Sequence, residues 1–187
     1  MASSSLAASS AAAADVARAS HASGIAVLST LAELRAWRKE RFARNETVGF
    51  VPTMGALHQG HLDLVRTSLR ETHSTIVSIY VNPAQFAPSE DLSSYPRTLP
   101  SDLAALSSLS SSSEDAPRSV SAVFAPSSAE MYPNGIEQDR AKQRGAFVEV
   151  AGLQDHMEGR SRPTFFRGVA TVVAKLFNAV QVSVVAF

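Results

Sequence analysis

The 187-residue sequence predicts an α/β fold, namely a Rossmann-like parallel sheet with flanking helices. Two observations predict it. Short β-prone runs alternate along the chain with segments of helical spacing, which is the pattern of βαβ units. Polar and glycine-containing segments follow the expected strands, at the end of an open α/β sheet where ligands bind. Because the crossover connections of such units are right-handed, the helices are expected to cover the faces of the sheet.

The bounds of the expected elements come from apolar spacing and from turn residues. Apolar residues three and four apart indicate a helix, and β-branched runs indicate a strand. We expect Pro52 to end the strand before it, since proline lacks the N–H that a central strand needs. The pattern predicts helices over 30–43, 61–69, 101–110 and 169–180, and strands over 47–51, 74–81, 119–124 and 146–150.

Two segments interrupt this regular pattern. Residues 1–24 start with a Ser/Ala-rich run and are expected to form a disordered tail, because large apolar side chains are scarce there. An organelle transit peptide is the alternative, supported by Arg18 and opposed by Asp15. Serines concentrated at 107–113 indicate a flexible insertion over 104–120, either a plain surface loop or a phosphorylated regulatory loop.

The remaining residues, 25–187, are expected to form one domain that is incomplete at its C-terminus. Residues 181–187 are mostly apolar and end the chain without a polar residue after them. An uncovered apolar strand is prone to aggregate. This ending therefore indicates that a further part of the domain is missing.

Composition excludes several classes of function. Seventeen basic and seventeen acidic side chains give a formal net charge of zero, which removes the electrostatic argument for nucleic acid or an anionic membrane as a partner. The absence of cysteine excludes disulfides, thiolate nucleophiles and iron–sulfur clusters. No stretch is long and apolar enough to predict a transmembrane helix. We expect a cytoplasmic protein, with a mitochondrial one as the alternative.

The main candidate for a chemical site is the stretch VPTMGALHQGH, which joins an expected strand to an expected helix. Gly60 lets the backbone approach a ligand closely, and His61 would open the helix, where free N–H groups favour an anion. The imidazoles of His58 and His61 can donate hydrogen bonds to one phosphate group. The alternatives are ordinary surface histidines or two ligands of a metal ion.

Polar residues also follow the next expected strand. Asn82 and Gln85 come after its end, where amides can hold the hydroxyl and carboxylate groups of a small substrate, although Asn-Pro is also a common turn. Tyr95 lies in a YPRT motif that is either part of the site or a surface loop. Before the last helix stand three arginines that belong either to the site or to a solvated loop: Arg160, Arg162 and Arg167.

Taken together, these motifs resemble the pantothenate synthetase (pantoate–β-alanine ligase) family. The resemblance covers about residues 25–180. An H-x-G-H motif alone is shared by many nucleotidyltransferases, whereas its combination with NPAQF and YPRT is specific. The matching stretches are PTMGALHQGH at 52–61, IYVNPAQF at 79–86, EDLSSYPRTLPSDL at 90–103, VFAPSSAEMYPNG at 123–135 and SRPTFFRGVATVVAKLFN at 161–178.

The resemblance implies an ATP-dependent ligase that uses Mg²⁺ and joins pantoate to β-alanine. In the family, the pantoate carboxylate attacks the α-phosphate of ATP and releases pyrophosphate. The β-alanine amine then attacks the pantoyl adenylate and releases AMP. Since a carboxylate is already nucleophilic, catalysis of the first step consists of positioning and charge stabilisation. Members of the family are commonly dimers, so a homodimer is a possible assembly.

The resemblance also implies a role for each matched residue. His58 and His61 would be the catalytic residues at the ATP phosphates. No metal ligand is assigned, and Asp102 or a neighbour is the candidate for a place near Mg²⁺. The implied ATP-binding set is Pro52, Thr53, Met54, Gly55, His58, Gly60 and His61, and the implied pantoate-binding set is Met54, Asn82, Gln85, Tyr95 and Arg162.

Two departures from the family pattern affect the expected activity. Phe165 stands where many members have a histidine. The family also continues into a strand end that bears a lysine and an aspartate, and into a C-terminal lid domain, which are expected to be absent here. This chain is therefore expected to be impaired or inactive alone. The alternatives are a non-catalytic binding module and another H-x-G-H nucleotidyltransferase.

Overall fold

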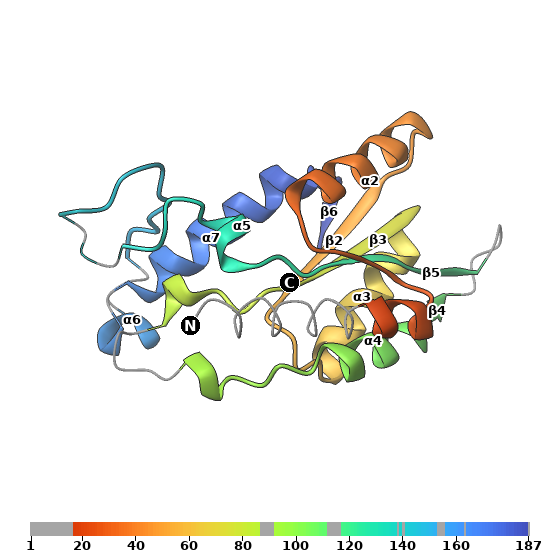
Figure 1. Ribbon diagram of the computed structural model, residues 1–187, viewed down its shortest axis with the longest axis horizontal. Helices are drawn as coiled ribbons and strands as arrows, with labels where there is room; N and C mark the ends of the chain where they lie inside the picture. The colour runs from red at the N-terminus through yellow and green to blue at the C-terminus, as the bar shows by residue number, and fades with distance from the viewer. Residues whose placement is uncertain are drawn as a thin grey trace, which may run out of the picture.

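The computed structural model describes residues 17–86, 92–111, 117–137, 139, 141–152, 156–162 and 164–186. Within them, five parallel strands form a sheet in the order β1-β5-β3-β2-β6 (Figure 1). This sheet with its flanking helices confirms the expected fold class. The strands are β1 (Ala26–Leu28), β2 (Val48–Thr53), β3 (Ser74–Ile79), β5 (Arg118–Phe124) and β6 (Val184–Val185), and the short β4 (Ser110–Ser111) pairs antiparallel with β5.

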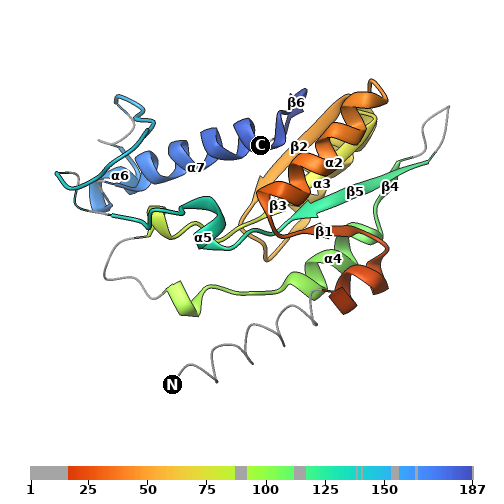
Figure 2. The same ribbon diagram turned by 45° about the horizontal axis from the view of Figure 1, so that its top comes forward.

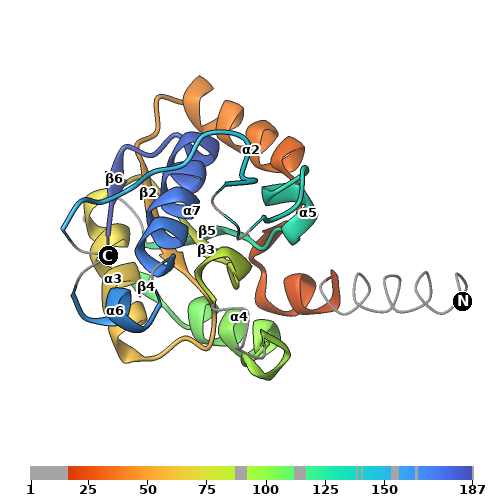
Figure 3. The ribbon, with the colours of Figure 1, turned by 90° about the vertical axis from the view of Figure 1, so that its left-hand side faces the viewer.

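The helices lie on both faces of the sheet. Figure 3 shows α2 and α7 on one side and α3 and α4 on the other, and Figure 2 shows α4 on the far side of the strands from α2. None of the described helices is long and apolar enough to cross a membrane. The helices are α2 (Leu31–Ala43), α3 (Gln59–Glu71), α4 (Leu99–Ser107), α5 (Ser128–Met131), α6 (Glu158–Ser161) and α7 (Phe165–Val180), and two 3₁₀ turns are η1 (Pro83–Gln85) and η2 (Leu92–Ser94).

The strands separate two cores because successive side chains point to opposite faces. Phe50 and Ile76 are buried against α2 and α7, whereas Val51 and Val77 are buried against α3 and α4. β3 is covered on both faces, and its buried residues include Ser74, Thr75 and Ser78 beside Ile76 and Val77. The two cores hold the strand ends, and therefore the loops that follow them, in fixed positions.

The strand order places a switch point beside β2. The chain runs from β2 to β3 and β5 in one direction and then returns to β6 on the other side of β2. In open α/β sheets, ligands bind outside the carboxyl ends of the strands where the order reverses in this way. The segment that follows β2 carries the H-x-G-H motif, so the fold brings that motif to the switch point.

The expected end of the first long strand at Pro52 is wrong, because β2 continues through Pro52 to Thr53. The carbonyls of Val48 and Phe50 accept hydrogen bonds from the β6 side, at Ser183 and Ala186. Since bonding sides alternate along a parallel strand, Pro52 also faces that side, beyond the last pair of β6. Its missing N–H therefore breaks no bond of the sheet.

Residues 146–150 do not form the expected strand, which is a second correction. They run alongside α7, where the Val148 N–H donates to the Thr171 hydroxyl at 3.0 Å. Val148 and Val150 are 40% and 37% exposed. Their alternating pattern resembles that of a strand, but the segment joins no strand of the described sheet. A segment becomes a strand of the sheet only when the edge of another strand lies beside it, and the local sequence does not specify that neighbour.

The expected flexible insertion over 104–120 is wrong at both of its ends. Helix α4 continues to Ser107, and β4 pairs with the start of β5. Leu106 and Leu109 are buried in the core beside α3, so apolar burial outweighs the serine-rich composition. The central residues 112–116 lie outside the described part of the chain.

The expected disordered tail over 1–24 is also wrong near its end. Residues 17–23 form a helical segment, and Ala19 packs against the core below α3 and α4. The Ser20 hydroxyl donates to the Ile25 carbonyl at 2.7 Å and links this segment to the start of β1. Residues 1–16 lie outside the described residues, so the prediction there is not tested.

Candidate functional site

The loop between β2 and α3 turns sharply, because two successive residues have left-handed backbone conformations. Gly55 has a φ of +87° and Ala56 a φ of +50°. Glycine adopts positive φ without a steric penalty. A Cβ atom on Gly55 would lie 3.1 Å from both the Asp102 Oδ2 atom and the Ile79 Cγ2 atom. The loop therefore lies directly on α4 and the end of β3.

Thr53 closes the base of this loop. Its hydroxyl donates to the Ser78 carbonyl at 2.7 Å and accepts from the Gly55 N–H at 3.2 Å. The residue is 8% exposed. Thr53 therefore joins β2, β3 and the loop through its side chain, and a contact of Thr53 with ATP stays a prediction, as it does for Pro52.

The two histidines cap the N-terminus of α3, which begins at Gln59 and not at His61 as expected. The Nδ1 atom of His58 accepts from the Gly60 N–H at 3.1 Å, and the Nδ1 atom of His61 faces the His58 N–H at 3.5 Å. This network assigns the proton of each neutral ring to Nε2. The ring centroids are 4.1 Å apart, so the two rings, each with an Nε2–H donor, lie side by side.

The electrostatics of this helix end favour an anion. Burial lowers the pKa of His61 below its ordinary value of 6.5, the charge of His58 lowers it further, and Asp102 opposes the shift. His61 is therefore neutral at pH 7. The first turn of α3 carries no acidic side chain, so the positive end of the helix dipole is not compensated there.

A cavity of about 350 Å³ borders the loop at the carboxyl ends of β2, β3 and β5. Met54 and Gly55 form one wall, and Tyr80, Thr98 and Ser127 belong to the others. Its volume suits a small polar ligand or part of a nucleotide. The ends of β2, β3 and β5 thus leave a space next to the histidine loop, on the side of β2 that faces β3.

Asn82 is buried in a complete set of hydrogen bonds. Its Oδ1 atom accepts from the Tyr132 hydroxyl at 3.0 Å and from the Ala84 N–H at 3.3 Å. Its Nδ2 atom donates to the Gln85 Oε1 atom and to the Gly168 carbonyl, both at 3.2 Å. With 1% of its surface exposed, Asn82 orients Gln85 in this structure. Its direct contact with pantoate stays a prediction.

Gln85, from the predicted pantoate-binding set, contacts Met54, which belongs to the predicted ATP-binding and pantoate-binding sets. Its Nε2 atom lies 3.0 Å from the Met54 sulfur, so the structure brings together two residues that are far apart in sequence. Tyr95 packs edge-to-face on Phe86, which follows Gln85, with the ring centroids 5.9 Å apart. Burial raises the pKa of the Tyr95 hydroxyl, and the charge of Asp102 adds to that shift.

Arg162 lies at the junction of α6 and α7. Its guanidinium is 3.5 Å from Glu158 and lies over the Phe165 ring, 5.7 Å from the ring centroid. Phe165, which stands where many family members have histidine, thus offers an aromatic face to this arginine. Binding of pantoate by Arg162 stays a prediction.

Two residues at the site were missed by sequence reasoning or given a different role. The Tyr132 hydroxyl bonds to Asn82, fifty residues away, and no local signal predicts that contact. Asp102, considered only as a neighbour of Mg²⁺, accepts from the backbone N–H groups of Ala56 and Leu57. Its place in the YPRTLPSDL motif was the signal in the sequence that could have marked Asp102 as a residue of the site.

The described residues do not form a resident metal centre. They contain no cluster of three or more His, Asp or Glu side chains that could hold an ion. Both oxygens of Asp102 already accept hydrogen bonds from N–H or O–H donors.

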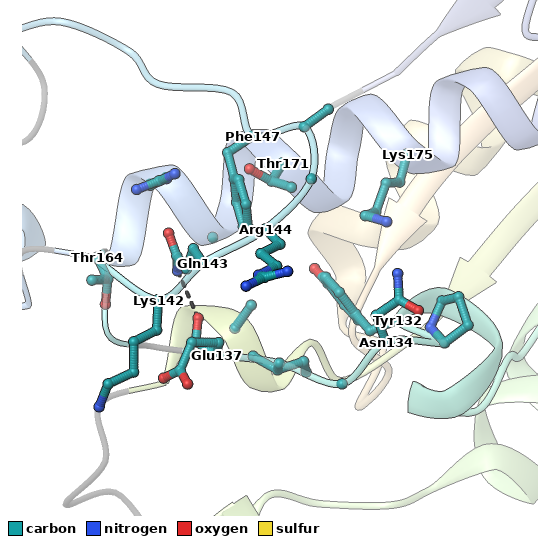
Figure 4. A pocket seen from close by; sticks show the side chains of 18 residues that line it. Tyr132, Asn134, Glu137, Lys142, Gln143, Arg144, Phe147, Thr164, Thr171 and Lys175 are labelled. Carbon is teal, nitrogen blue, oxygen red and sulfur yellow. Dashed lines mark hydrogen bonds between the residues drawn. The ribbon is translucent and has the colours of Figure 1, made fainter.

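A second cavity, of about 470 Å³, lies between α7 and the segments 132–137 and 142–147 (Figure 4). Two of its cations have partners, since Lys142 pairs with Asp139 at 3.2 Å and Lys175 donates to the Met131 carbonyl at 3.2 Å. Arg167 likewise pairs with a glutamate at 3.3 Å. None of the lining residues comes from the histidine loop, so this cavity is not assigned to the nucleotide.

The doubly wound parallel sheet, with paired histidines at the helix that follows its switch strand, defines an α/β nucleotidyltransferase-like protein. Comparison with known proteins narrows the class. A profile described as pantoate-beta-alanine ligase matches residues 26–187. The chain belongs to the pantoate–β-alanine ligase, or pantothenate synthetase, family.

Individual relatives agree with this assignment. The pantoate–β-alanine ligase of Saccharomyces cerevisiae is 49% identical over 164 residues, which cover 86% of this chain and 50% of the relative. The crystal structure of pantothenate synthetase from Thermus thermophilus matches with a TM-score of 0.68 and 43% identity, over 86% of this chain and 51% of that one. The Francisella tularensis enzyme, solved with "Beta-gamma ATP" and β-alanine, matches with a TM-score of 0.69 and 32% identity, over 86% and 55%. The chain thus spans about half the length of the relatives that it matches.

Proposed function

We propose that this protein takes part in the ATP-dependent ligation of pantoate and β-alanine, through a pantoyl adenylate, and that this chain supplies the part that binds ATP and pantoate. The observation that carries the proposal is the pair of Nε2–H groups at the start of α3, side by side at the switch point of the sheet. Family membership and the nucleotide in the Francisella tularensis relative support it.

In the first step, a carboxylate oxygen of pantoate attacks the α-phosphorus of ATP, and the bond to pyrophosphate breaks. Negative charge grows on the phosphate oxygens as the fifth bond forms. We assign His58 and His61 to the stabilisation of that charge, because imidazole N–H groups held at a helix N-terminus are preorganised donors. ATP enters as MgATP, and the first step needs no general base.

In the second step, the β-alanine amine attacks the acyl carbon of the adenylate. An amide bond forms, AMP leaves, and the amine loses a proton. Gln85 and Met54 lie in contact beside the histidine loop, and we assign them to pantoate. Positioning of this kind supplies much of the rate enhancement in two-substrate reactions.

We further propose a homodimer in the cytoplasm. The dimer is supported by the resemblance, because members of the family are commonly dimers. The mitochondrion is the alternative location, because the chain starts with a Ser/Ala-rich segment that contains Arg18. Sedimentation of the purified protein measures the oligomeric state, and cell fractionation measures the location.

The function is tested by titrating the chain with MgATP and by measuring pantoate-dependent exchange between ATP and pyrophosphate. We expect His58→Ala and His61→Ala each to weaken MgATP binding at least tenfold. The exposed His156 offers the control, since His156→Gln alters a histidine far along the chain from α3. Equal affinity in all these variants would contradict the assignment of the pair to the phosphates.

A second function is favoured by one observation, the half-length match to the relatives. In that function the chain alone is a binding module, which binds MgATP and pantoate without catalysing the ligation. MgATP binding without pantoate-dependent exchange indicates that function, whereas exchange shows that this chain suffices for the first step.

A further inference from the structure

Asp102 belongs to α4, but its carboxylate is directed at the loop between β2 and α3. The residue is 3% exposed. Its Oδ1 atom accepts from the Leu57 N–H at 2.9 Å, and its Oδ2 atom accepts from the Ala56 N–H at 3.1 Å. The Thr98 hydroxyl, one helical turn before it, donates to Oδ2 at 3.0 Å.

The loop needs such a partner, because it has left both regular elements at this point. The left-handed conformation of Ala56 is unfavourable for a residue with a Cβ atom, so other contacts must hold it. The Leu57 N–H donates to Asp102, and the Ala56 N–H is shared between Asp102 and the Thr98 hydroxyl, which lies 3.2 Å from the Ala56 nitrogen. Hydrogen bonds to a charged carboxylate are stronger than those between neutral groups, and loss of the carboxylate leaves the Leu57 N–H unpaired and the Ala56 N–H with the Thr98 hydroxyl alone.

The same contact determines where α3 starts. Leu57 directly precedes His58, the N-cap residue, whose carbonyl accepts the first helical bond from the Leu62 N–H at 3.1 Å. A shift of the Leu57 amide therefore moves the His58 backbone. It also breaks the two contacts that hold the imidazoles through their Nδ1 atoms.

We propose that Asp102 is a positioning residue for the histidine pair: its carboxylate holds the amides of Ala56 and Leu57, so that His58 caps α3 and both Nε2–H groups face the anion. The claim about MgATP rests on the proposed function, whereas the claim about ring geometry does not. With both oxygens occupied in this way, Asp102 acts on the nucleotide through the loop.

The first experiment reads ring geometry in the complete 187-residue chain without any nucleotide. Long-range ¹H–¹⁵N NMR spectra distinguish an imidazole nitrogen that accepts a hydrogen bond from one that carries the proton. We expect His58 and His61 to show an acceptor Nδ1 in the wild-type chain, and Asp102→Ala to lose that pattern at His58. A wild-type pattern in the Asp102→Ala chain would overturn the proposal.

The control separates positioning from general loss of stability. Leu103, the next residue on α4, is 1% exposed and packs in the core beside α3. Leu103→Ala is expected to lower stability and to keep both ring patterns. If Asp102→Ala does not fold, the nearly isosteric Asp102→Asn replaces it, because its NH₂ group faces one of the two amide donors and weakens the pattern at His58. Unchanged rings in Asp102→Asn, or lost patterns in Leu103→Ala, would count against the proposal.

The second experiment measures MgATP affinity in the same variants. We expect Asp102→Ala to bind at least tenfold more weakly than wild type, and Leu103→Ala to bind within about twofold of it under conditions where both are folded. Wild-type affinity in Asp102→Ala would overturn the link between Asp102 and the nucleotide. A wild-type chain that binds no MgATP would instead contradict the proposed function, and the ring spectra would still decide the positioning claim.

Discussion

The histidine pair shows how a backbone contact decides the chemistry of a side chain. An isolated imidazole exchanges its proton between two nitrogens, but here the Gly60 amide occupies the Nδ1 atom of His58 at 3.1 Å. That leaves Nε2–H as the donor for a ligand. Burial lowers the pKa of His61, so that ring donates without bringing a buried positive charge. The donors that we propose for a phosphate are therefore held in place in the chain alone, which is the condition for electrostatic stabilisation of a transition state.

The lowered pKa of His61 predicts a pH-dependent stability. In the folded chain His61 binds a proton less readily than in the unfolded chain, whose pKa is the ordinary 6.5. The unfolded state therefore binds more protons below about pH 6.5, and the free energy of unfolding falls as the pH drops through that value. We expect His61→Gln to make stability less dependent on pH between about 7.5 and 5.5, as measured by urea unfolding.

His156→Gln is the matched control for this effect, since His156 is exposed. The control is expected to keep the wild-type pH dependence. An identical slope in the His61→Gln and wild-type chains would show that folding does not perturb His61.

At the scale of elements, the contact between α7 and η1 holds Gln85 in place. The Gly168 carbonyl accepts from Asn82, and a Cβ atom at Gly168 would overlap the Ala84 carbonyl group, with its carbon only 2.7 Å away. The helix can approach the turn this closely only because position 168 lacks a side chain. Gln85 in turn meets Met54 from the loop after β2, so three elements converge on that pair.

Gly168→Ala is expected to push η1 away from α7. Overpacking of a tight contact destabilises by about 1–3 kcal/mol, and we expect a loss of free energy of unfolding in that range by urea titration. The displaced turn should also shift the side-chain amide signals of Gln85 in ¹H–¹⁵N spectra.

Ala174→Ser on the same helix is the control, because Ala174 lines a cavity of about 380 Å³ with room for one more atom. Its expected cost is the difference in helix propensity, about 0.5 kcal/mol. Equal stability of the Gly168→Ala and wild-type chains would contradict the close packing of α7 on η1.

At the scale of the whole molecule, β6 covers the edge of β2. The N–H groups of Ser183 and Ala186 donate to Val48 and Phe50, and the Ser183 hydroxyl accepts from the Val48 N–H at 3.1 Å. Val48 and Phe50 are themselves fully buried. The strand β2 thus has hydrogen-bonded neighbours on both sides.

Deletion of residues 183–187 is expected to expose that edge. At least three hydrogen bonds of about 0.5–1.5 kcal/mol each are lost, so we expect the free energy of unfolding to fall by about 2 kcal/mol or more. An unpaired apolar edge also recruits other chains, and light scattering should show self-association.

Ala186→Pro keeps the chain length and removes one amide donor. We expect a smaller loss of stability than in the deletion, without aggregation. A deletion variant as stable and as monodisperse as the wild-type chain would contradict the role of β6 as a cover for β2.

The local sequence pattern was sufficient to predict those helices and strands whose apolar spacing and turn residues agree with each other. The burial of both sheet faces requires apolar runs such as those of β3 and β5, and these were predictable. The H-x-G-H motif, its place after a strand and the family resemblance were also readable, since each depends on neighbouring residues. Pro52 and residues 146–150 were assigned wrongly, because the effect of a proline or an alternating run depends on which edge lies beside it.

The sequence by itself determined the α/β class, the family and the candidate residues, because periodicity and motif order are properties of the chain. Only the tertiary structure decided how these residues are used. Asn82 is enclosed by Gln85, Tyr132 and Gly168, and Asp102 holds a loop 45 residues away from it. The physical reason is that a hydrogen bond of a buried polar group must be satisfied by whatever partner folding brings near, and separation along the chain carries no information about that partner.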